Sequence, residues 1–273
     1  MKQRLIVAGV GIPVLLLILL AAPVWATAAM CALLSAVGCY ELMHAVGRDE
    51  WKLLCLMPLF AAWMCTSIGL GGEWTPEPGL YMAAACFVAV VYTFAMAVVT
   101  HGRERSLSFR TAMAGLFAMS AIAAGFACLV ILRDISPAVV LTPFIGAFMS
   151  DTGAFFAGRA FGKRKLCPAV SPNKTVAGCI GGFVGSIAGM AVFHLVVKTW
   201  FQLDLGWGVV ILMGVIGSLF GQLGDLSFSV IKREFGIKDY GAIFPGHGGV
   251  LDRFDSVLFV APAYLLFMLL YFA

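Results

Sequence analysis

"VAGCIGGFVGSIAGMAVFHLVV", residues 176–197, contains no aspartate, glutamate, lysine or arginine. A helix needs roughly 17 to 25 predominantly apolar residues to cross the hydrocarbon core of a bilayer, and this stretch has 22. The whole chain of 273 residues has the same character, because 62% of its residues are hydrophobic and only 12% are charged. So little polar surface cannot cover a soluble domain of this size. The sequence therefore predicts an integral membrane protein.

Apolar windows of similar length recur along the chain and define the fold class. We predict nine transmembrane spans, at about 5–22, 24–46, 53–70, 80–100, 111–132, 137–158, 176–197, 207–231 and 254–273. Pro23 alone separates the first two windows, so these form two spans, one helical hairpin or a re-entrant pair, and the first could instead be a cleaved signal peptide. The predicted fold is an all-α polytopic helical bundle. It is a single transmembrane domain, 1–273, with N-terminal helices to about 135 and a catalytic part at about 137–273.

The distribution of basic residues predicts the orientation, because lysine and arginine near helix ends prefer the cytoplasmic side. When the loops are numbered alternately from an inside N-terminus, sixteen of the eighteen basic residues fall on inside loops, and only Arg133 and Lys198 fall outside. This split favours an odd number of spans, with the N-terminus inside and the C-terminus outside. It also places the two longest polar connections, residues 159–175 and 232–253, on the cytoplasmic side.

Other patterns exclude several kinds of site. The net charge of +4 is spread over many short loops, so no nucleic-acid partner is predicted. The eight cysteines include no CxxC pair, so neither a zinc site nor a disulfide framework is indicated. Glycines that share helix faces predict close helix packing rather than a dinucleotide-binding loop; they are Gly178, Gly182, Gly185, Gly189, Gly214, Gly217, Gly221 and Gly224. Such small-residue surfaces equally permit a homodimer.

Three carboxylates interrupt the apolar windows, although an aspartate at mid-bilayer costs about 2.5 to 3.5 kcal/mol on insertion scales. Asp151 and Asp225 each adjoin a polar connection, and we interpret them as functional. For Glu41 the simpler interpretation is preferred, in which the carboxylate reaches interfacial water or pairs with a nearby basic residue. Asp225, Ser229 and Lys232 are spaced at 0, 4 and 7, so they share one narrow helix face.

The connection that follows Lys232 has the composition of a phosphate site. "KDYGAIFPGHGGVLDRFDS", residues 238–256, combines three aspartates with basic residues and four glycines. If a helix begins near Leu251, Asp252 and Asp255 share a face. Oxygen-only acidic groups suit a hard cation such as Mg²⁺, while glycine backbone and basic side chains suit phosphate oxygens. The pattern predicts a site for a metal-bound polyphosphate, and the alternative is a tight charged turn between two spans.

Residues 229–255, "SVIKREFGIKDYGAIFPGHGGVLDRFD", closely resemble the C-terminal signature of bacterial phosphatidate cytidylyltransferases, also called CDP-diacylglycerol synthases. "GDL" at 224–226, "SDTGA" at 150–154 and "SPNKT" at 171–175 also resemble this family. The resemblance is strong over about 149–256, whereas the first 140 residues match only as apolar spans. The chain departs from the family at two positions, since Asn173 replaces the usual lysine and Ala177 the usual glutamate.

The resemblance implies transfer of the cytidylyl group of CTP to phosphatidic acid, giving CDP-diacylglycerol and pyrophosphate, with Mg²⁺ required and a second cation as an option. It implies a place in phospholipid biosynthesis, in the bacterial cytoplasmic (inner) membrane. Asp225 and Asp252 become the first choice of metal ligands, with Asp255 and Asp151 as further ligands. The catalytic candidates are Asp225, Asp252, Lys232, Asp239 and His247. The substrate-binding candidates are Ser229, Arg233, Lys238, Gly248, Gly249, Arg253, Lys174 and Ser171.

Two alternatives of other kinds stay open at this point. An ion-coupled transporter would use Asp151 and Asp225 to bind its coupling ion, but it leaves the phosphate-type loop unexplained. A different CTP-dependent lipid kinase or cytidylyltransferase would share most of the predicted site. The substrates and products separate these alternatives. Only a phosphatidate cytidylyltransferase couples CTP to phosphatidic acid and releases pyrophosphate.

Overall fold

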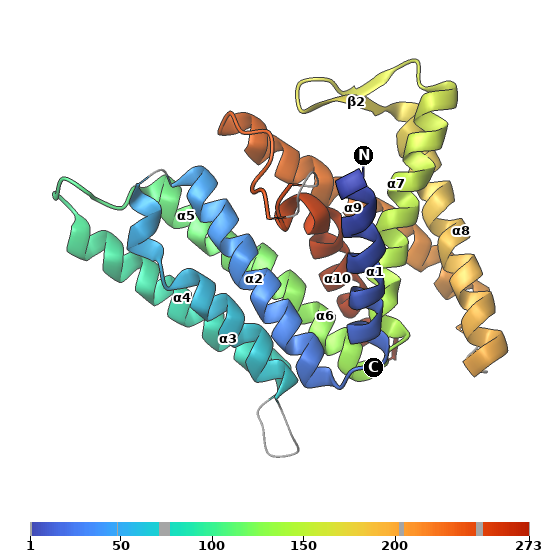
Figure 1. Ribbon diagram of the computed structural model, residues 1–273, viewed down its shortest axis with the longest axis horizontal. Helices are drawn as coiled ribbons and strands as arrows, with labels where there is room; N and C mark the ends of the chain where they lie inside the picture. Colours follow the sequence, from blue (N-terminus) through green and yellow to red (C-terminus); the bar gives the residue numbers. More distant parts are fainter. Residues whose placement is uncertain (1, 48, 71–76, 202–204, 244–247, 273) are drawn as a thin grey trace. The chain divides into compact units, whose positions relative to one another are not determined.

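A computed structural model describes residues 2–47, 49–70, 77–201, 205–243 and 248–272, and most of them are helical (Figure 1). Each of the nine predicted windows coincides with one helix or with a continuous run of helical segments. Eight of these, beginning at Val24–Val46, are long enough and apolar enough among the described residues to cross a membrane. Before them, the apolar stretch Gly11–Leu20 is shorter. The predicted all-α transmembrane fold is confirmed.

The chain divides into two compact units, and the first comprises residues 1–137 and 235–254. Its helices are α1 (Lys2–Leu20), α2 (Val24–Val46), α3 (Met57–Gly69), α4 (Pro78–Thr100), α5 (Phe109–Phe117) and α6 (Ala124–Ile135). A short 3₁₀ helix, Glu50–Leu54, precedes α3, and a π-helical segment, Ala118–Ala123, joins α5 to α6. The predicted span at 111–132 is therefore one continuous helical run.

Helix α2 is the centre of the first unit, because it packs against both α3 and α6 (Figure 1). Buried apolar side chains fill the space around it, among them Met64 of α3 and Phe126 of α6. In contrast, large apolar side chains such as Phe87 and Val98 of α4 are exposed. An apolar outer face is what contact with lipid requires of a spanning helix, since lipid supplies no hydrogen-bonding partner.

The second unit comprises residues 138–234 and 255–273. It contains a short 3₁₀ helix, Val139–Leu141, followed by α7 (Thr142–Phe161), α8 (Val176–Phe201) and α9 (Trp207–Glu234). It also contains most of α10 (Leu251–Phe272), whose first residues belong to the other unit. Two short antiparallel strands, β1 (Lys165–Cys167) and β2 (Ser171–Thr175), form a hairpin between α7 and α8. The sequence predicted only a polar connection there.

Glycines allow α7 and α8 to approach until their backbones touch, and Figure 1 shows the two helices side by side. A Cβ atom on Gly153 would lie 2.9 Å from Cα of Gly185, and one on Gly158 would lie 3.6 Å from Cα of Gly178. On α9, a Cβ on Gly214 would lie 2.6 Å from Cα of Ile187. The prediction that glycines such as Gly178, Gly185 and Gly214 serve helix packing is confirmed.

We expect Gly153→Ala to destabilise the protein by about 1–3 kcal/mol, because the added methyl group collides with backbone atoms that cannot move aside independently. Gly208→Ala is the matched control, since Gly208 also lies in a helix but has no neighbouring atom within 4 Å of a built Cβ. The control should change stability by no more than about 0.5 kcal/mol. Thermal unfolding in detergent measures both, and equal midpoints for the two variants would contradict the packing role.

Candidate functional site

Asp225 lies in α9 and forms an ion pair with Lys174 of β2. Both side chains are partly buried, with 28% of the aspartate and 23% of the lysine side chain exposed, so the pair is better shielded from water than a surface pair. The Ser229 hydroxyl donates a hydrogen bond of 3.4 Å to Oδ1 of Asp225. The predicted helix face of Asp225 and Ser229 is therefore present, and Lys174 joins it from another element.

The β1–β2 hairpin brings Lys174 to this position. Its second strand ends at Thr175, whose Oγ1 accepts a hydrogen bond of 3.0 Å from the Gly178 N–H in the first turn of α8. This is an N-terminal cap that fixes where the strand becomes a helix. At the hairpin turn, Nε of Arg233 donates to the Val170 carbonyl at 3.1 Å. Arg233, predicted to bind substrate, thus attaches the hairpin to the end of α9 in this structure.

Two more carboxylates lie near Asp225 within the second unit. Asp151 of α7 is within electrostatic range of both Asp225 and Lys174. Asp255 of α10 is within electrostatic range of Asp225, Asp151 and Lys232. Three carboxylates from three helices and two ammonium groups are therefore gathered in one region. This mixture of charges can hold a cation and the anionic groups that accompany it.

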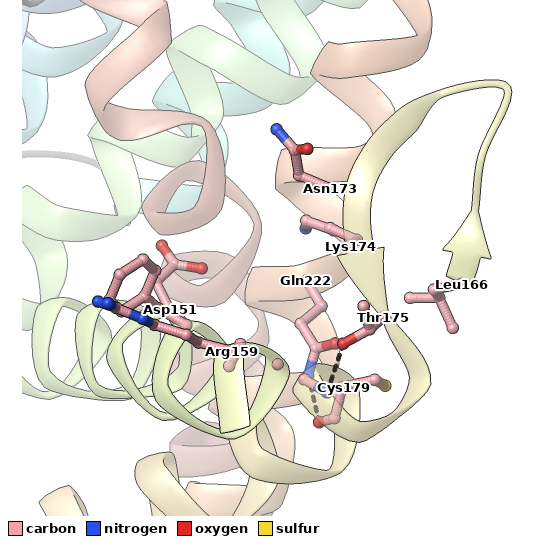
Figure 2. A pocket seen from close by; sticks show the side chains of 12 residues that line it. Asp151, Arg159, Leu166, Asn173, Lys174, Thr175, Cys179 and Gln222 are labelled. Carbon is pink, nitrogen blue, oxygen red and sulfur yellow. Dashed lines mark hydrogen bonds between the residues drawn. The ribbon is translucent and has the colours of Figure 1, made fainter. Parts of the chain in front are cut away.

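A pocket of about 470 Å³ opens beside these charged groups. Figure 2 shows two of its lining residues from α7, Asp151 and Arg159, on the opposite side from Asn173, Lys174 and Thr175 of β2. Its remaining lining includes small residues of α7 and α8, which leave room for a ligand. A pocket lined by one carboxylate, two cationic side chains and several neutral donors suits a polar, anionic molecule.

Gln222 of α9 forms part of this lining and is held by buried hydrogen bonds (Figure 2). Its Nε2 donates to the Cys179 carbonyl at 3.2 Å and to the Ser218 hydroxyl at 2.8 Å. The Ser218 and Ser150 hydroxyls are 2.9 Å apart and share a further hydrogen bond. This network links α7, α8 and α9 and thereby fixes the helices that present Asp151 and Asp225.

The signature segment around Asp252 belongs to the first unit. Oδ2 of Asp252 accepts hydrogen bonds of 2.9 Å from the backbone N–H groups of Tyr240 and Gly249. Gly248 adopts a positive φ of 87°, a conformation that favours glycine. Asp252 therefore closes its own loop, and the Gly249 N–H, expected to face phosphate, donates to this carboxylate. Asp225 and Asp252 belong to different units, so a metal site shared between them stays a prediction.

Glu41 is placed differently from the sequence interpretation. Its side chain is 3% exposed and accepts hydrogen bonds of 3.0 Å from the backbone N–H groups of Val250 and Leu251. The expectation that Glu41 reaches interfacial water or a basic side chain is wrong. A buried carboxylate needs several donors to offset its lost hydration, and here backbone amides 209 and 210 residues along the chain supply them.

The remaining predicted residues are distributed over both units. Lys232 is half-buried near the end of α9, and Ser171 is half-buried at the start of β2. Lys238 and Asp239, in the segment after α9, are exposed, as is Arg253 in the first turn of α10. His247 lies outside the described residues. Arg159, Asn173 and Gln222 were not predicted as site residues; a polar glutamine within the glycine-rich run of α9 was the available signal for Gln222.

The carboxylates fit a hard cation in donor type and in charge, because Asp151, Asp225 and Asp255 offer only oxygen atoms. Among the described residues, however, no three aspartate, glutamate, histidine or cysteine side chains are close enough to hold a metal ion together. Lys174 supplies positive charge beside Asp225 and Asp151 in this arrangement. A cation in this region would require the carboxylates to converge or phosphate oxygens to complete its coordination.

Comparison with known proteins identifies the family of this chain. A sequence model of the cytidylyltransferase family matches residues 2–271. A phosphatidate cytidylyltransferase of Staphylococcus haemolyticus is 36% identical over 234 residues, covering 84% of this chain and 85% of the relative. The enzyme of Staphylococcus saprophyticus is 38% identical over 70% of each chain, and that of Staphylococcus aureus is 42% identical over 66% of this chain and 65% of its own. The chain therefore belongs to the phosphatidate cytidylyltransferase family.

Proposed function

We propose that this protein transfers the cytidylyl group of CTP to phosphatidic acid, giving CDP-diacylglycerol and pyrophosphate. Family membership supports this reaction. The structural observation that carries it is the Lys174–Asp225 ion pair beside a polar pocket of about 470 Å³. The pair joins a carboxylate suited to a cation with an ammonium group suited to phosphate, and both reactants carry phosphate.

The chemistry needs charge neutralisation more than a strong base. The second pKa of a phosphate monoester is about 6, so the phosphate of phosphatidic acid is largely a dianion at pH 7. One of its oxygens attacks the α-phosphorus of CTP, and the bond to the bridging oxygen of the pyrophosphate leaving group breaks. Cationic side chains that face the reacting phosphates lower the cost of bringing these anions together. Lys174 and Arg159 line the pocket, and Lys232 lies near Asp255.

We propose Mg²⁺ as the cofactor, held by Asp225 with help from Asp151 and Asp255, and with Asp252 as a further ligand. Bound Mg²⁺ would offset negative charge on the phosphate oxygens of CTP. The donor type and the crowding of carboxylates in the second unit support this assignment. Lys174 would then be released from Asp225 and become available to a phosphate.

We further propose that the site faces the cytoplasm, where CTP is available, in the inner membrane of a bacterium. The charge distribution supports this orientation, because sixteen of the eighteen basic residues fall on the same side of the predicted topology. Phosphatidic acid would enter laterally from the bilayer, since its acyl chains stay in the lipid phase.

Asp225→Asn should lower the rate of CDP-diacylglycerol formation at least about 100-fold, because it removes the charge that binds the cation and pairs with Lys174. Purified protein in detergent would receive labelled CTP, Mg²⁺ and phosphatidic acid, with the labelled lipid product measured. Asp49→Asn is the matched control, because Asp49 forms an exposed pair with Lys52. Two results with the wild-type protein would refute the proposed reaction. Release of free CDP would indicate a lipid kinase, and unchanged CTP would favour a transporter.

Lys174→Met should lower kcat/KM for CTP by about 10- to 100-fold while the protein stays folded. The methionine keeps most of the length of the side chain but removes its charge from Asp225 and from the pocket. Lys163→Met serves as the control, because Lys163 lies in the same connection, is exposed and does not line the pocket. If both variants keep wild-type kinetics, Lys174 has no part in the reaction.

Fusion reporters can test the proposed orientation. A fluorescent protein that matures only in the cytoplasm should be bright when fused after residue 240, and a phosphatase that is active only outside the cytoplasm should be active when fused after the last residue of the chain. The physical reason is the preference of lysine and arginine for the cytoplasmic side. The opposite pattern would place the Lys238 segment outside and would remove the basis for CTP access.

A further inference from the structure

The Glu41 carboxylate of α2 is held at the start of α10 by two backbone N–H groups. The Val250 N–H donates to Oε1 and the Leu251 N–H donates to Oε2, each at 3.0 Å. The first N–H groups of a helix have no partner within the helix, and the helix dipole favours negative charge there. Each oxygen of Glu41 is therefore matched to one donor, and α2 and the first turn of α10 are fixed to each other.

Two glycines leave room for this carboxylate. A Cβ atom built on Gly241 would lie 2.9 Å from Cδ of Glu41, and one on Gly249 would lie 2.6 Å from the same atom. Real Cβ atoms do not approach other atoms so closely, so any larger residue at either position would displace Glu41. Gly241 directly follows Tyr240, and Gly249 lies two residues before the start of α10. The carboxylate thus lies beside both Gly241 and Gly249.

The same loop is closed by Asp252, which accepts hydrogen bonds from Tyr240 and Gly249. Helix α2 also meets the loop one turn before Glu41, where a Cβ on Gly38 would lie 3.1 Å from Cδ2 of Leu251. Glu41 and Asp252 therefore bind consecutive backbone groups, since Gly249 donates to Asp252 whereas Val250 and Leu251 donate to Glu41. Glu41 holds the segment from which Asp252 projects.

We propose that Glu41 is a positioning residue for the reaction, which fixes the described parts of the 238–252 loop, Gly241 and residues 248–250, together with the first turn of α10, in the geometry that catalysis requires. The inference rests on the proposed function, because this loop carries the predicted catalytic residues Asp239 and Asp252. Glu41 itself does not touch substrate; it acts through the backbone of Val250 and Leu251. Its distance in sequence from the loop explains why no motif within residues 229–255 contains it.

The kinetic test uses purified full-length protein and compares Glu41→Gln with wild type. The amide keeps one acceptor oxygen but turns the second into a donor that faces an N–H group. We expect kcat to fall about 10- to 100-fold, while KM for phosphatidic acid stays within about twofold, because the substitution displaces Asp252, which is predicted to act in the reaction step. Cys39→Ala is the matched control, since Cys39 is buried in α2 two residues earlier and its thiol contacts Ala118 instead.

A double-mutant cycle distinguishes loss of the specific Glu41 contact from a general folding defect in the Glu41→Gln variant. Gly241→Ala should lower kcat by about tenfold in the wild type, because its methyl group pushes the Glu41 carboxylate away. In a Glu41→Ala background the methyl group has space, so the further loss should be less than about twofold. Independent effects of the two substitutions would overturn the proposed contact.

Hydrogen exchange of peptides that cover residues 248–256 tests the inference separately from the reaction. Exchange should be about tenfold faster in Glu41→Gln than in wild type or Cys39→Ala. If the wild type makes no CDP-diacylglycerol, the proposed function fails, and faster exchange still supports the role of Glu41 in holding the loop. The positioning role of Glu41 would be overturned if kcat and hydrogen exchange were unchanged in Glu41→Gln. An equal loss of kcat in Cys39→Ala would also overturn it.

Discussion

Every carboxylate that enters an apolar helix of this protein must receive hydrogen bonds or an opposite charge, because lipid and packed side chains supply neither. Asp225 meets this requirement with Lys174 of the hairpin, and Glu41 meets it with the backbone of α10. Each partner lies on an element distant in sequence. The requirement therefore fixes the hairpin to α9 in one unit and the signature loop to α2 in the other.

The helices could be predicted from the sequence because their determinant is local. A window of apolar residues predicts a span by length alone, and even the π-helical segment at Ala118–Ala123 leaves the run Phe109–Ile135 continuous. The face shared by Asp225 and Ser229 was predictable for the same reason, since four residues make about one helical turn. The structure adds the hydrogen bond between them.

The partners of the buried charges could not be predicted in this way. Nothing in the sequence around Glu41 indicates that its acceptors would be filled by amides about 210 residues later. The hairpin was missed because each strand has five residues or fewer and lacks a clear alternation of apolar and polar side chains. Gln222 was not predicted because a single amide is uncharged, and it therefore does not mark a functional position in an apolar helix as an aspartate does. These features depend on tertiary contacts that have no periodic signal.

Glycine has two separate uses in this chain, and they place different limits on it. In α7 and α8 it permits backbone contact, so the helices that carry Asp151 and line the pocket stay close together. At Gly241 and Gly249 it makes room for one carboxylate, so Glu41 can accept hydrogen bonds from the Val250 and Leu251 amides. The first use is spread over many positions of the packed helices, whereas the second depends on a single side chain. Gly241 and Gly249 of the family signature are therefore required by a side chain outside the signature, Glu41 of α2.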